Sequence, residues 1–181
     1  MSTPDPASRP SAAGRVKIVE GDITHQAVDA IVNAANTALK AGGGVDGAIH
    51  RAAGPALQAE LDGIGGCPTG ECRLSGGHRL PAPFLIHCVG PVWQGGGRDE
   101  ERLLADCYRS ALALARDKGL RSLAFPAIST GVYGFPKRRA AEIAIATVLA
   151  ELERDDSIDE VRFVAFDPET AALYRHFIAE L

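Results

Sequence analysis

Short apolar segments alternate with helix-like segments along most of this chain, and this alternation constrains its fold more than any other feature. Residues 29–35 (DAIVNAA), 83–90 (PFLIHCVG) and 121–128 (RSLAFPAI) are nearly continuous apolar runs, which are typical of strands buried on both faces. Residues 99–119 and 136–155 have the apolar spacing of amphipathic helices. Strands that alternate with helices join through right-handed crossovers into a mostly parallel sheet. We therefore expect a three-layer α/β/α sandwich with helices on both faces of the sheet.

Turn and helix-start signals indicate the remaining elements and the domain limits. We expect further strands over residues 15–22, 70–77 and 159–167, and further helices over residues 45–54, 55–62 and 168–181. Residues 1–14 (MSTPDPASRPSAAG) are rich in Pro, Ser and Ala and lack the hydrophobic region of a signal peptide. The 181 residues fit one domain well and two poorly. We therefore expect a disordered leader over 1–14 and a single domain over 15–181.

Charge and hydropathy restrict the partners and the location. The formal net charge of −4 gives no general attraction for nucleic acid or anionic lipid, although backbone amides could still hold a single anionic ligand. No apolar run approaches the roughly 20 residues that span a bilayer. We therefore expect a cytoplasmic protein, and nothing in the sequence requires more than a monomer.

The cysteines and histidines show no metal-binding pattern. The four cysteines have no CxxC spacing, and we expect all of them to be reduced structural thiols (Cys67, Cys72, Cys88 and Cys107). The five histidines are scattered and form no HExxH or comparable motif. We therefore expect no metal and no cofactor.

Several polar or glycine-rich loops follow the predicted strands. Ligands of open α/β sheets bind beyond the carboxyl ends of the strands. Gly42-Gly43-Gly44 precedes one helix and residues 129–134 (STGVYG) precede another, so each segment could turn backbone N–H groups towards an anion. Two such loops facing each other would suit a diphosphate. Neither loop matches GxxxxGK[ST] or GxGxxG, which excludes the Walker and Rossmann motifs.

Each of these residues also has an ordinary structural explanation when it is taken alone. Glycine-rich turns are common, and Asp46 could be a favourable charge in the first turn of a helix. Asn36 could be a turn residue, Tyr133 could cover apolar surface and Phe166 could belong to the core. Their convergence on one edge of the sheet favours a ligand site.

Two sequence blocks resemble the signatures of macrodomains, specifically the MacroD-type ADP-ribosyl hydrolases. They are GDITHQAVDAIVNAANTALKAGGGVDGAIHRAAGP (21–55) and AFPAISTGVYGFP (124–136), accompanied by HCVGPVW and FDPETAALY. The similarity runs from about Val16 to the C-terminus. It implies a mixed sheet of about six strands that binds ADP-ribose at the strand ends.

The resemblance also implies a role for each matching residue. Asp22 would accept a hydrogen bond from the adenine amino group, Ile23 would contribute its backbone N–H, and Phe166 would lie against the adenine. The diphosphate would be held by backbone amides of two segments (Gly43, Gly44 and Val45; Ser129, Thr130, Gly131 and Val132). Asn36 would hold a hydroxyl of the distal ribose, Tyr133 would pack on that ribose, and Asp46 would be the catalytic carboxylate.

The implied activity is hydrolysis of an ester at the distal ribose. The acyl group would be an Asp or Glu side chain of a modified protein, or acetate in O-acetyl-ADP-ribose. Asp46, taken as an exposed carboxylate and hence a weak base, would accept a proton from water or mainly position the water. Nucleic acid would be a partner only as an ADP-ribosylated substrate.

A binding module that reads ADP-ribose without hydrolysing it is the main alternative. Asn36 and Asp46, ten residues apart in the frame NAAN…GGGVDG, favour the hydrolase because plain readers tend to lack this pair. A nucleotide phosphatase ranks low, since the sequence offers no distinct nucleophile or metal cluster. Two segments depart from the family pattern: Lys40-Ala41 precedes the glycines, and residues 57–67 are short.

Overall fold

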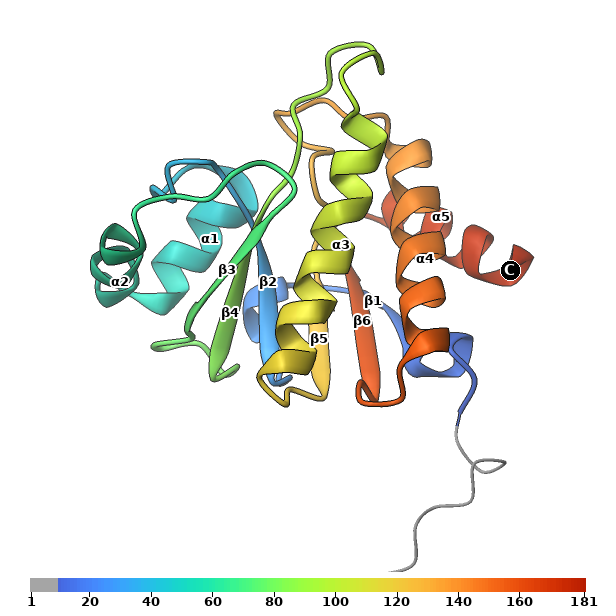
Figure 1. Cartoon of the computed structure of the whole chain (residues 1–181), viewed down its shortest axis with the longest axis horizontal. Coiled ribbons are helices and arrows are strands. Elements are labelled where there is room, and N and C mark those ends of the chain that lie inside the picture. The colour runs from blue at the N-terminus through green and yellow to red at the C-terminus, as the bar shows by residue number, and fades with distance from the viewer. Residues whose placement is uncertain (1–9) are drawn as a thin grey trace, which may run out of the picture.

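The computed structural model describes residues 10–181, which contain one six-stranded sheet (Figure 1). The strands are β1 (Val16–Glu20), β2 (Ala30–Ala35), β3 (Cys72–Gly76), β4 (Phe84–Val89), β5 (Ser122–Phe125) and β6 (Glu160–Ala165). They lie in the order β1-β6-β5-β2-β4-β3. Only the edge pair β3–β4 is antiparallel within the described residues, and all other neighbours are parallel. The prediction of a mixed, mostly parallel sheet of about six strands is confirmed.

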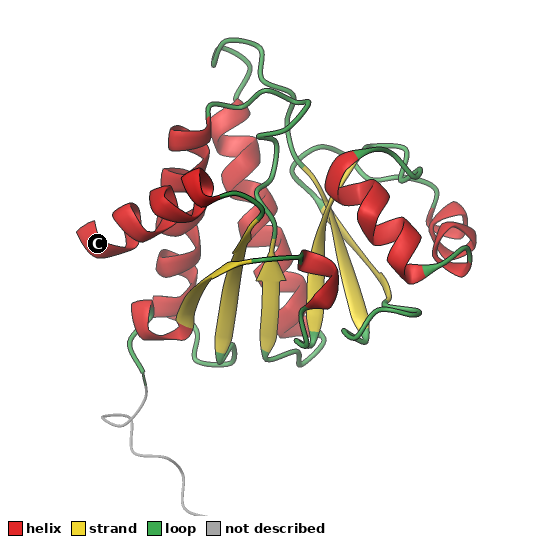
Figure 2. Cartoon of the chain, turned by 180° about the vertical axis from the view of Figure 1, so that it is seen from behind, coloured by secondary structure: helices red, strands yellow, loops and turns green. Residues whose placement is uncertain are grey.

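Helices cover both faces of this sheet (Figures 1 and 2). They are α1 (Gly44–Ala53), α2 (Ala56–Ile64), α3 (Glu100–Asp117), α4 (Lys137–Arg154) and α5 (Pro168–Glu180), with 3-10 turns η2 (Ala13–Arg15) and η3 (Ile23–His25). One face carries α1, α2 and η3, and the other carries α3 and α4, with α5 packed beside α4 and β1. We call these the α1/α2 face and the α3/α4 face.

Alternation of side chains along each strand divides the core between the two faces. On β2, Val32 packs towards the α3/α4 face and Ile31 towards the α1/α2 face. The α3/α4 face holds a group of buried rings, namely Tyr108, Phe125, Phe163 and Tyr174. The apolar cluster of the α1/α2 face contains aliphatic residues and Cys67 but no aromatic ring among the described residues. The core of the α3/α4 face therefore contains buried aromatic rings, whereas the core of the α1/α2 face is mainly aliphatic.

The N-terminal boundary of the domain can be followed from residue 10 onwards. Most of the predicted leader, residues 1–9, lies outside the described residues. Just after it, the Arg15 guanidinium donates to the carbonyl oxygens of Asp155 and Ile158 at 3.0 Å. These bonds attach η2 to the segment between α4 and β6, and the leader over 1–14 stays a prediction.

The prediction of four reduced thiols is wrong for two cysteines. Cys72 and Cys88 form a disulfide, whereas Cys67 and Cys107 are free and buried. The antiparallel pairing of β3 with β4 places Cys72 directly opposite Cys88, with their Cα atoms 4.3 Å apart. A separation of 16 residues in the sequence gives no sign of this register.

No helix within residues 10–181 is long and apolar enough to cross a membrane.

Candidate active site

A cleft of about 290 Å³ opens at the carboxyl ends of β2 and β5. Its walls contain nine of the residues predicted from the sequence: Asn36, Gly43, Gly44, Val45, Asp46, Ser129, Gly131, Val132 and Tyr133. The two glycine-containing loops thus face each other across one cleft, because β2 and β5 are neighbours in the sheet although they are far apart in the sequence.

The start of α1 requires glycine at two positions. Gly44, the first residue of α1, has a φ of +57°, which L side chains rarely adopt. A Cβ on Gly47 would lie 2.6 Å from the carbonyl oxygen of Gly42, so the loop folds back closely against the first turn of the helix. This close approach brings the loop backbone beside Asp46.

Asp46 is buried, with 6% of its surface exposed, which corrects the expectation of an exposed carboxylate. Its Oδ1 accepts a hydrogen bond from Asn33 Nδ2 at 2.7 Å and lies 3.3 Å from His50 Nε2. Its Oδ2 accepts from the backbone N–H of Gly42 at 2.7 Å. Since a carboxylate oxygen has two acceptor positions, Oδ2 keeps one position for a further donor. The carboxylate is therefore held from several sides, and Oδ2 keeps an acceptor position for a further donor.

Two side-chain amides hold the backbone between Asn36 and Gly42. Asn36 donates to the carbonyl oxygen of Lys40 at 2.8 Å and accepts from the N–H of Lys40 at 3.1 Å. Gln58, on α2, accepts from the N–H of Ala41 at 2.9 Å and donates to the carbonyl oxygen of Leu39 at 3.0 Å. Gln58 has no signal in the sequence, because only the packing of α2 beside this loop brings it there.

The opposite wall is a turn closed by its own backbone. The N–H of Phe135 donates to the carbonyl oxygen of Ser129 at 2.9 Å, and the N–H of Gly134 donates to that of Gly131 at 3.0 Å. Ser129 has a φ of +68°, an uncommon conformation for a residue with a side chain. Its Oγ is buried and has no partner among the described residues. A strained residue with an unpaired hydroxyl thus lies in the wall of the cleft.

Backbone N–H groups without a protein acceptor lie on both walls. Within residues 10–181, this is the case for Gly43, Gly44 and Val45 on one wall and for Gly131 and Val132 on the other. The first three belong to the cap and first turn of α1, where N–H groups have no partner inside the helix. Unpaired N–H groups and a helix N-terminus attract anions.

Four predicted site residues lie outside the cleft wall. Thr130 lines a separate small cavity next to Tyr108 and Tyr174. Asp22, Ile23 and Phe166 follow β1 and β6, which are paired in parallel at the same edge of the sheet. Phe166 is 93% exposed, whereas Ile23 is buried. These positions extend along the carboxyl edge from the cleft.

Asp22 caps the turn η3. Its Oδ1 accepts from the backbone N–H of Thr24 at 2.8 Å and from the Thr24 hydroxyl at 2.6 Å. These hydrogen bonds lower the pKa of the Asp22 carboxyl, so the group is ionised near neutral pH. Its other oxygen, Oδ2, lies 3.7 Å from His25 Nε2.

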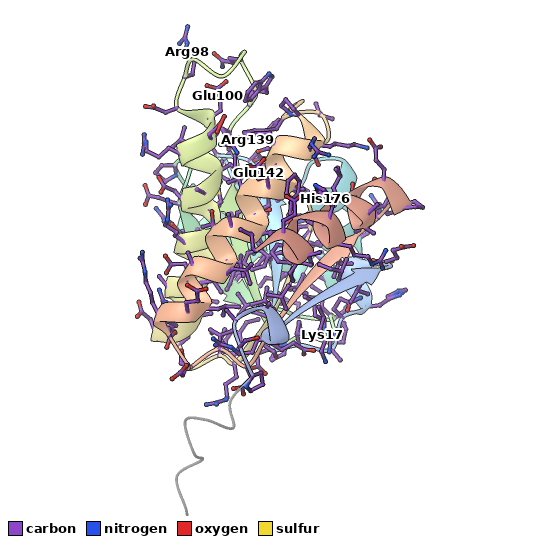
Figure 3. The ribbon with its side chains drawn as sticks, turned by 90° about the vertical axis from the view of Figure 1, so that its right-hand side faces the viewer. Lys17, Arg98, Glu100, Arg139, Glu142 and His176 are labelled. Carbon is purple, nitrogen blue, oxygen red and sulfur yellow. A yellow bond between two sulfur atoms is a disulfide. The ribbon has the colours of Figure 1, made fainter. Side chains whose placement is uncertain are left out.

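A buried carboxylate organises the loop beside Tyr133. Glu100 lies at the start of α3, close to the loop that carries Arg98 (Figure 3). It accepts from the backbone N–H groups of Gln94 and Gly96 at 2.9 and 2.8 Å and also from that of Arg98. Burial opposes ionisation of Glu100, but these donors lower its pKa. The N–H of Trp93 then donates to the carbonyl oxygen of Tyr133 at 2.8 Å. The loop before α3 thereby supports one wall of the cleft.

A row of buried polar residues, not predicted from the sequence, lies under Asp46. Asn33, His87 and Ser75 are at most 2% exposed, and they lie on β2, β4 and β3. Burial and, to a smaller extent, nearby His50 together lower the pKa of His87 to about 4. The available signal was a polar residue inside each of two apolar strands, DAIVNAA and PFLIHCVG. No group of three or more metal-ligating side chains occurs among residues 10–181.

Comparison with known sequences identifies relatives along almost the whole chain. Residues 32–144 match the family described as Macro domain. A Macro domain-containing protein of Methanosarcina mazei is 52% identical over 92% of this chain and 89% of its own length. A Klebsiella pneumoniae protein named O-acetyl-ADP-ribose deacetylase is 55% identical over 90% of this chain and 95% of its own length.

Solved structures give the same relationship. The Oceanobacillus iheyensis macrodomain with ADP superimposes with a TM-score of 0.88 and 44% identity, covering 91% of this chain and 90% of that one. The Trypanosoma brucei macrodomain in complex with ADP-ribose has a TM-score of 0.87 and 43% identity, covering 93% of this chain and 73% of that one.

Proposed function

This chain belongs to the Macro domain family, and on that basis we propose that it hydrolyses the ester linkage at the distal ribose of ADP-ribose derivatives. The proposed substrates are O-acetyl-ADP-ribose and proteins that carry mono-ADP-ribose on Asp or Glu side chains. The name O-acetyl-ADP-ribose deacetylase, borne by relatives about 55% identical, supports the first of these. The observation that carries the proposal is Asp46, a buried carboxylate whose Oδ2 keeps an acceptor position, between two walls of unpaired N–H groups.

The proposed binding mode follows the order of the strands. The diphosphate lies between the N–H groups of Gly43, Gly44 and Val45 and those of Ser129, Thr130, Gly131 and Val132. The adenine lies over the ends of β1 and β6, against Phe166, with Asp22 and the N–H of Ile23 as its polar partners. The distal ribose contacts Tyr133, and a ribose hydroxyl bonds to Asn36. Exposure of Phe166 supports this mode, because an apolar ring at 93% exposure has no packing partner in the free protein.

Asn36 keeps hydrogen-bonding capacity for such a hydroxyl. Its amide nitrogen has two hydrogens and its oxygen two lone pairs, and the loop uses one of each. The bonds to Lys40 fix the plane of the amide in advance. This preorganisation would orient the ribose without an additional loss of side-chain freedom on binding.

The proposed chemistry uses Asp46 on a water molecule. Oδ2 accepts a hydrogen bond from the water, whose oxygen attacks the acyl or anomeric carbon. The ester bond breaks, the carboxylic acid and ADP-ribose separate, and the water supplies one proton and one hydroxyl to the products. A positioned base contributes about 10²- to 10⁴-fold to such a reaction. Orientation of the ribose supplies a further part of the acceleration.

The test is to incubate the protein with O-acetyl-ADP-ribose and, separately, with a Glu-linked mono-ADP-ribosylated protein, and to measure released ADP-ribose. Asp46→Ala should lower turnover by about 10²- to 10⁴-fold and still bind ADP-ribose. Asp117→Ala is the matched control, since it removes an exposed carboxylate at the far end of α3. An Asp46→Ala protein with more than half of the wild-type rate would remove Asp46 from the mechanism.

The alternative function is a reader of ADP-ribose. Binding of ADP-ribose without release from either substrate would support the reader and overturn the hydrolase. The geometry of Asp46 favours the hydrolase, because a site that only binds a diphosphate gains nothing from a buried carboxylate beside it.

A further inference from the structure

The row of polar residues beneath Asp46 crosses three strands of the sheet. Asn33 and His87 are directly opposite each other on β2 and β4, and Ser75 lies on the neighbouring strand β3. All three side chains are buried on the face that α1 covers, and none of them belongs to a wall of the cleft. Burying polar groups costs free energy unless they are hydrogen-bonded, so an apolar core gains nothing from such a row.

The hydrogen bonds of the row have one consistent direction. Asn33 Nδ2 carries two hydrogens and has two acceptors, Asp46 Oδ1 at 2.7 Å and His87 Nδ1 at 3.1 Å. His87 Nδ1 must then be unprotonated, and its Nε2–H donates to Ser75 Oγ at 2.8 Å. The Ser75 hydroxyl in turn donates to the carbonyl oxygen of Gly76 at 3.1 Å. Asn33 and Ser75 therefore favour the same tautomer of His87, and His87 accepts the second hydrogen of Asn33.

The orientation of the Asn33 amide matters for Asp46. Asn33 Oδ1 is buried and has no partner among the described residues, so the amide is held only through its nitrogen. If the amide turned over, its oxygen would face Asp46 Oδ1, and two acceptors would repel each other. The acceptor at His87 Nδ1 disfavours the turned amide, because Nδ1 pairs with the second N–H of Asn33 only in the observed orientation.

We propose that His87 is a positioning residue of the catalytic carboxylate, acting through Asn33 to keep Asp46 Oδ1 occupied and Oδ2 directed at the reacting water. This inference rests on the proposed hydrolase function. The groups that face the row are Asp46 and His50 from α1, and His50 Nε2 also lies beside Asp46 Oδ1. His87 itself touches neither the cleft nor the substrate in this proposal.

Three variants separate the positioning role from a purely structural one. His87→Phe removes the acceptor, and His87→Asn restores one, because the amide oxygen of Asn can replace Nδ1. Ser75→Ala removes one of the two groups that favour this tautomer. Ile31→Val, on the same strand and face as Asn33, is the matched control for a small change in core packing.

The measured quantities are kcat and KM on O-acetyl-ADP-ribose, the Kd for ADP-ribose, and the thermal midpoint of each protein. We expect kcat to fall about 10-fold or more in His87→Phe and about 3-fold in Ser75→Ala, with Kd changed less than about 2-fold. His87→Asn should recover kcat to within about 3-fold of the wild type. An unchanged kcat in folded Ser75→Ala and His87→Phe, or no recovery in His87→Asn, would overturn the proposal.

A measurement that does not depend on catalysis accompanies the kinetics. Nitrogen-15 NMR of the wild type should show His87 protonated on Nε2 only, and the side-chain amide signal of Asn33 should move in Ser75→Ala and His87→Phe but not in Ile31→Val. A His87 protonated on Nδ1 would overturn the proposal. A wild type that binds ADP-ribose but hydrolyses neither ester would overturn the proposed function, and the NMR signals would still decide whether His87 orients Asn33.

Discussion

Helices cover both faces of the sheet, but the residues beneath α1 differ in kind from those beneath α3 and α4. On the α3/α4 face, Phe163 packs on Tyr174 and Phe125 with ring centroids 4.9 and 5.9 Å apart. On the α1/α2 face, the equivalent depth beneath α1 holds Asn33, His87 and the buried end of Asp46. Rings bury much apolar area and impose little on their neighbours beyond shape, whereas a hydrogen-bonded row fixes the orientation of each member. The aromatic group therefore serves packing alone, whereas the polar row also fixes the side chains beside the cleft.

The largest expected effect comes from breaking the aromatic packing. Phe163 is fully buried among three rings, so Phe163→Ala should cost about 3–5 kcal/mol of unfolding free energy. Urea denaturation measures this cost. The protein that remains folded should keep the wild-type kcat, and a fall in kcat per folded molecule would contradict the separation of the two faces.

The next largest effect is a pH dependence of the free energy of unfolding, which arises from His87 on the α1/α2 face. The pKa of His87 is about 4 in the folded protein, against about 6.5 in an unfolded chain. Between these pH values the unfolded chain binds more protons at this residue, so the free energy of unfolding falls as pH falls, by about 3 kcal/mol in total.

Urea denaturation at pH 7 and at pH 4 tests this linkage. The wild type should lose about 3 kcal/mol more than His87→Asn across this interval, because the variant has no group to protonate there. Equal losses in the two proteins would show that His87 titrates alike in the folded and unfolded chains.

A smaller effect, on turnover, is expected from Asn36 at the rim of the cleft. Asn36→Ala removes the amide that holds Lys40 and that we expect to orient the distal ribose. Turnover should fall about 10- to 100-fold, equivalent to about 1.4–2.7 kcal/mol in the barrier, with a smaller change in the Kd for ADP-ribose. Single-turnover kinetics beside calorimetric binding test this, and unaltered single-turnover kinetics would count against a role for Asn36.

The smallest effect is expected from Gln58, which supports the same loop from α2. Gln58→Ala removes two hydrogen bonds to the backbone of Leu39 and Ala41 at a half-exposed position. The cost should be about 1 kcal/mol in stability. Hydrogen exchange should become faster in residues 39–42 and stay unchanged in α3, and equal protection in both proteins would show that the loop does not depend on Gln58.

The pattern of apolar and polar residues along the sequence was sufficient to predict the α/β/α fold and most of the residues of the cleft. Alternating strands and helices place the loops after β2 and β5 at the same edge of the sheet, and this accounts for Asn36, Asp46 and Ser129. What the sequence could not supply is the pairing of one strand with another. Asn33 meets His87, and Cys72 meets Cys88, only in the observed register, and a shift by one residue would turn each side chain to the other face.

The position of Gln58 and the burial of Asp46 also depend on contacts between elements that are distant in the sequence. Gln58 contacts the loop only because α2 lies beside it, and Asp46 is covered only because α1 rests its first turn on β2. Neither position has a local signal that separates it from an ordinary helix surface. Thr130 shows the reverse case, since its place in the motif STGVYG indicates the cleft while it lines another cavity.

The disulfide between Cys72 and Cys88 has a consequence for the edge of the sheet. β3 is an edge strand, and such strands expose unpaired N–H and C=O groups that can recruit other chains into aggregates. A covalent tie to β4 prevents β3 from peeling away or sliding along its neighbour, so the same bond that blunts this hazard keeps Ser75 facing inward beside His87. The disulfide on one side of β3 thus stabilises the hydrogen bond between Ser75 and His87 on its other side.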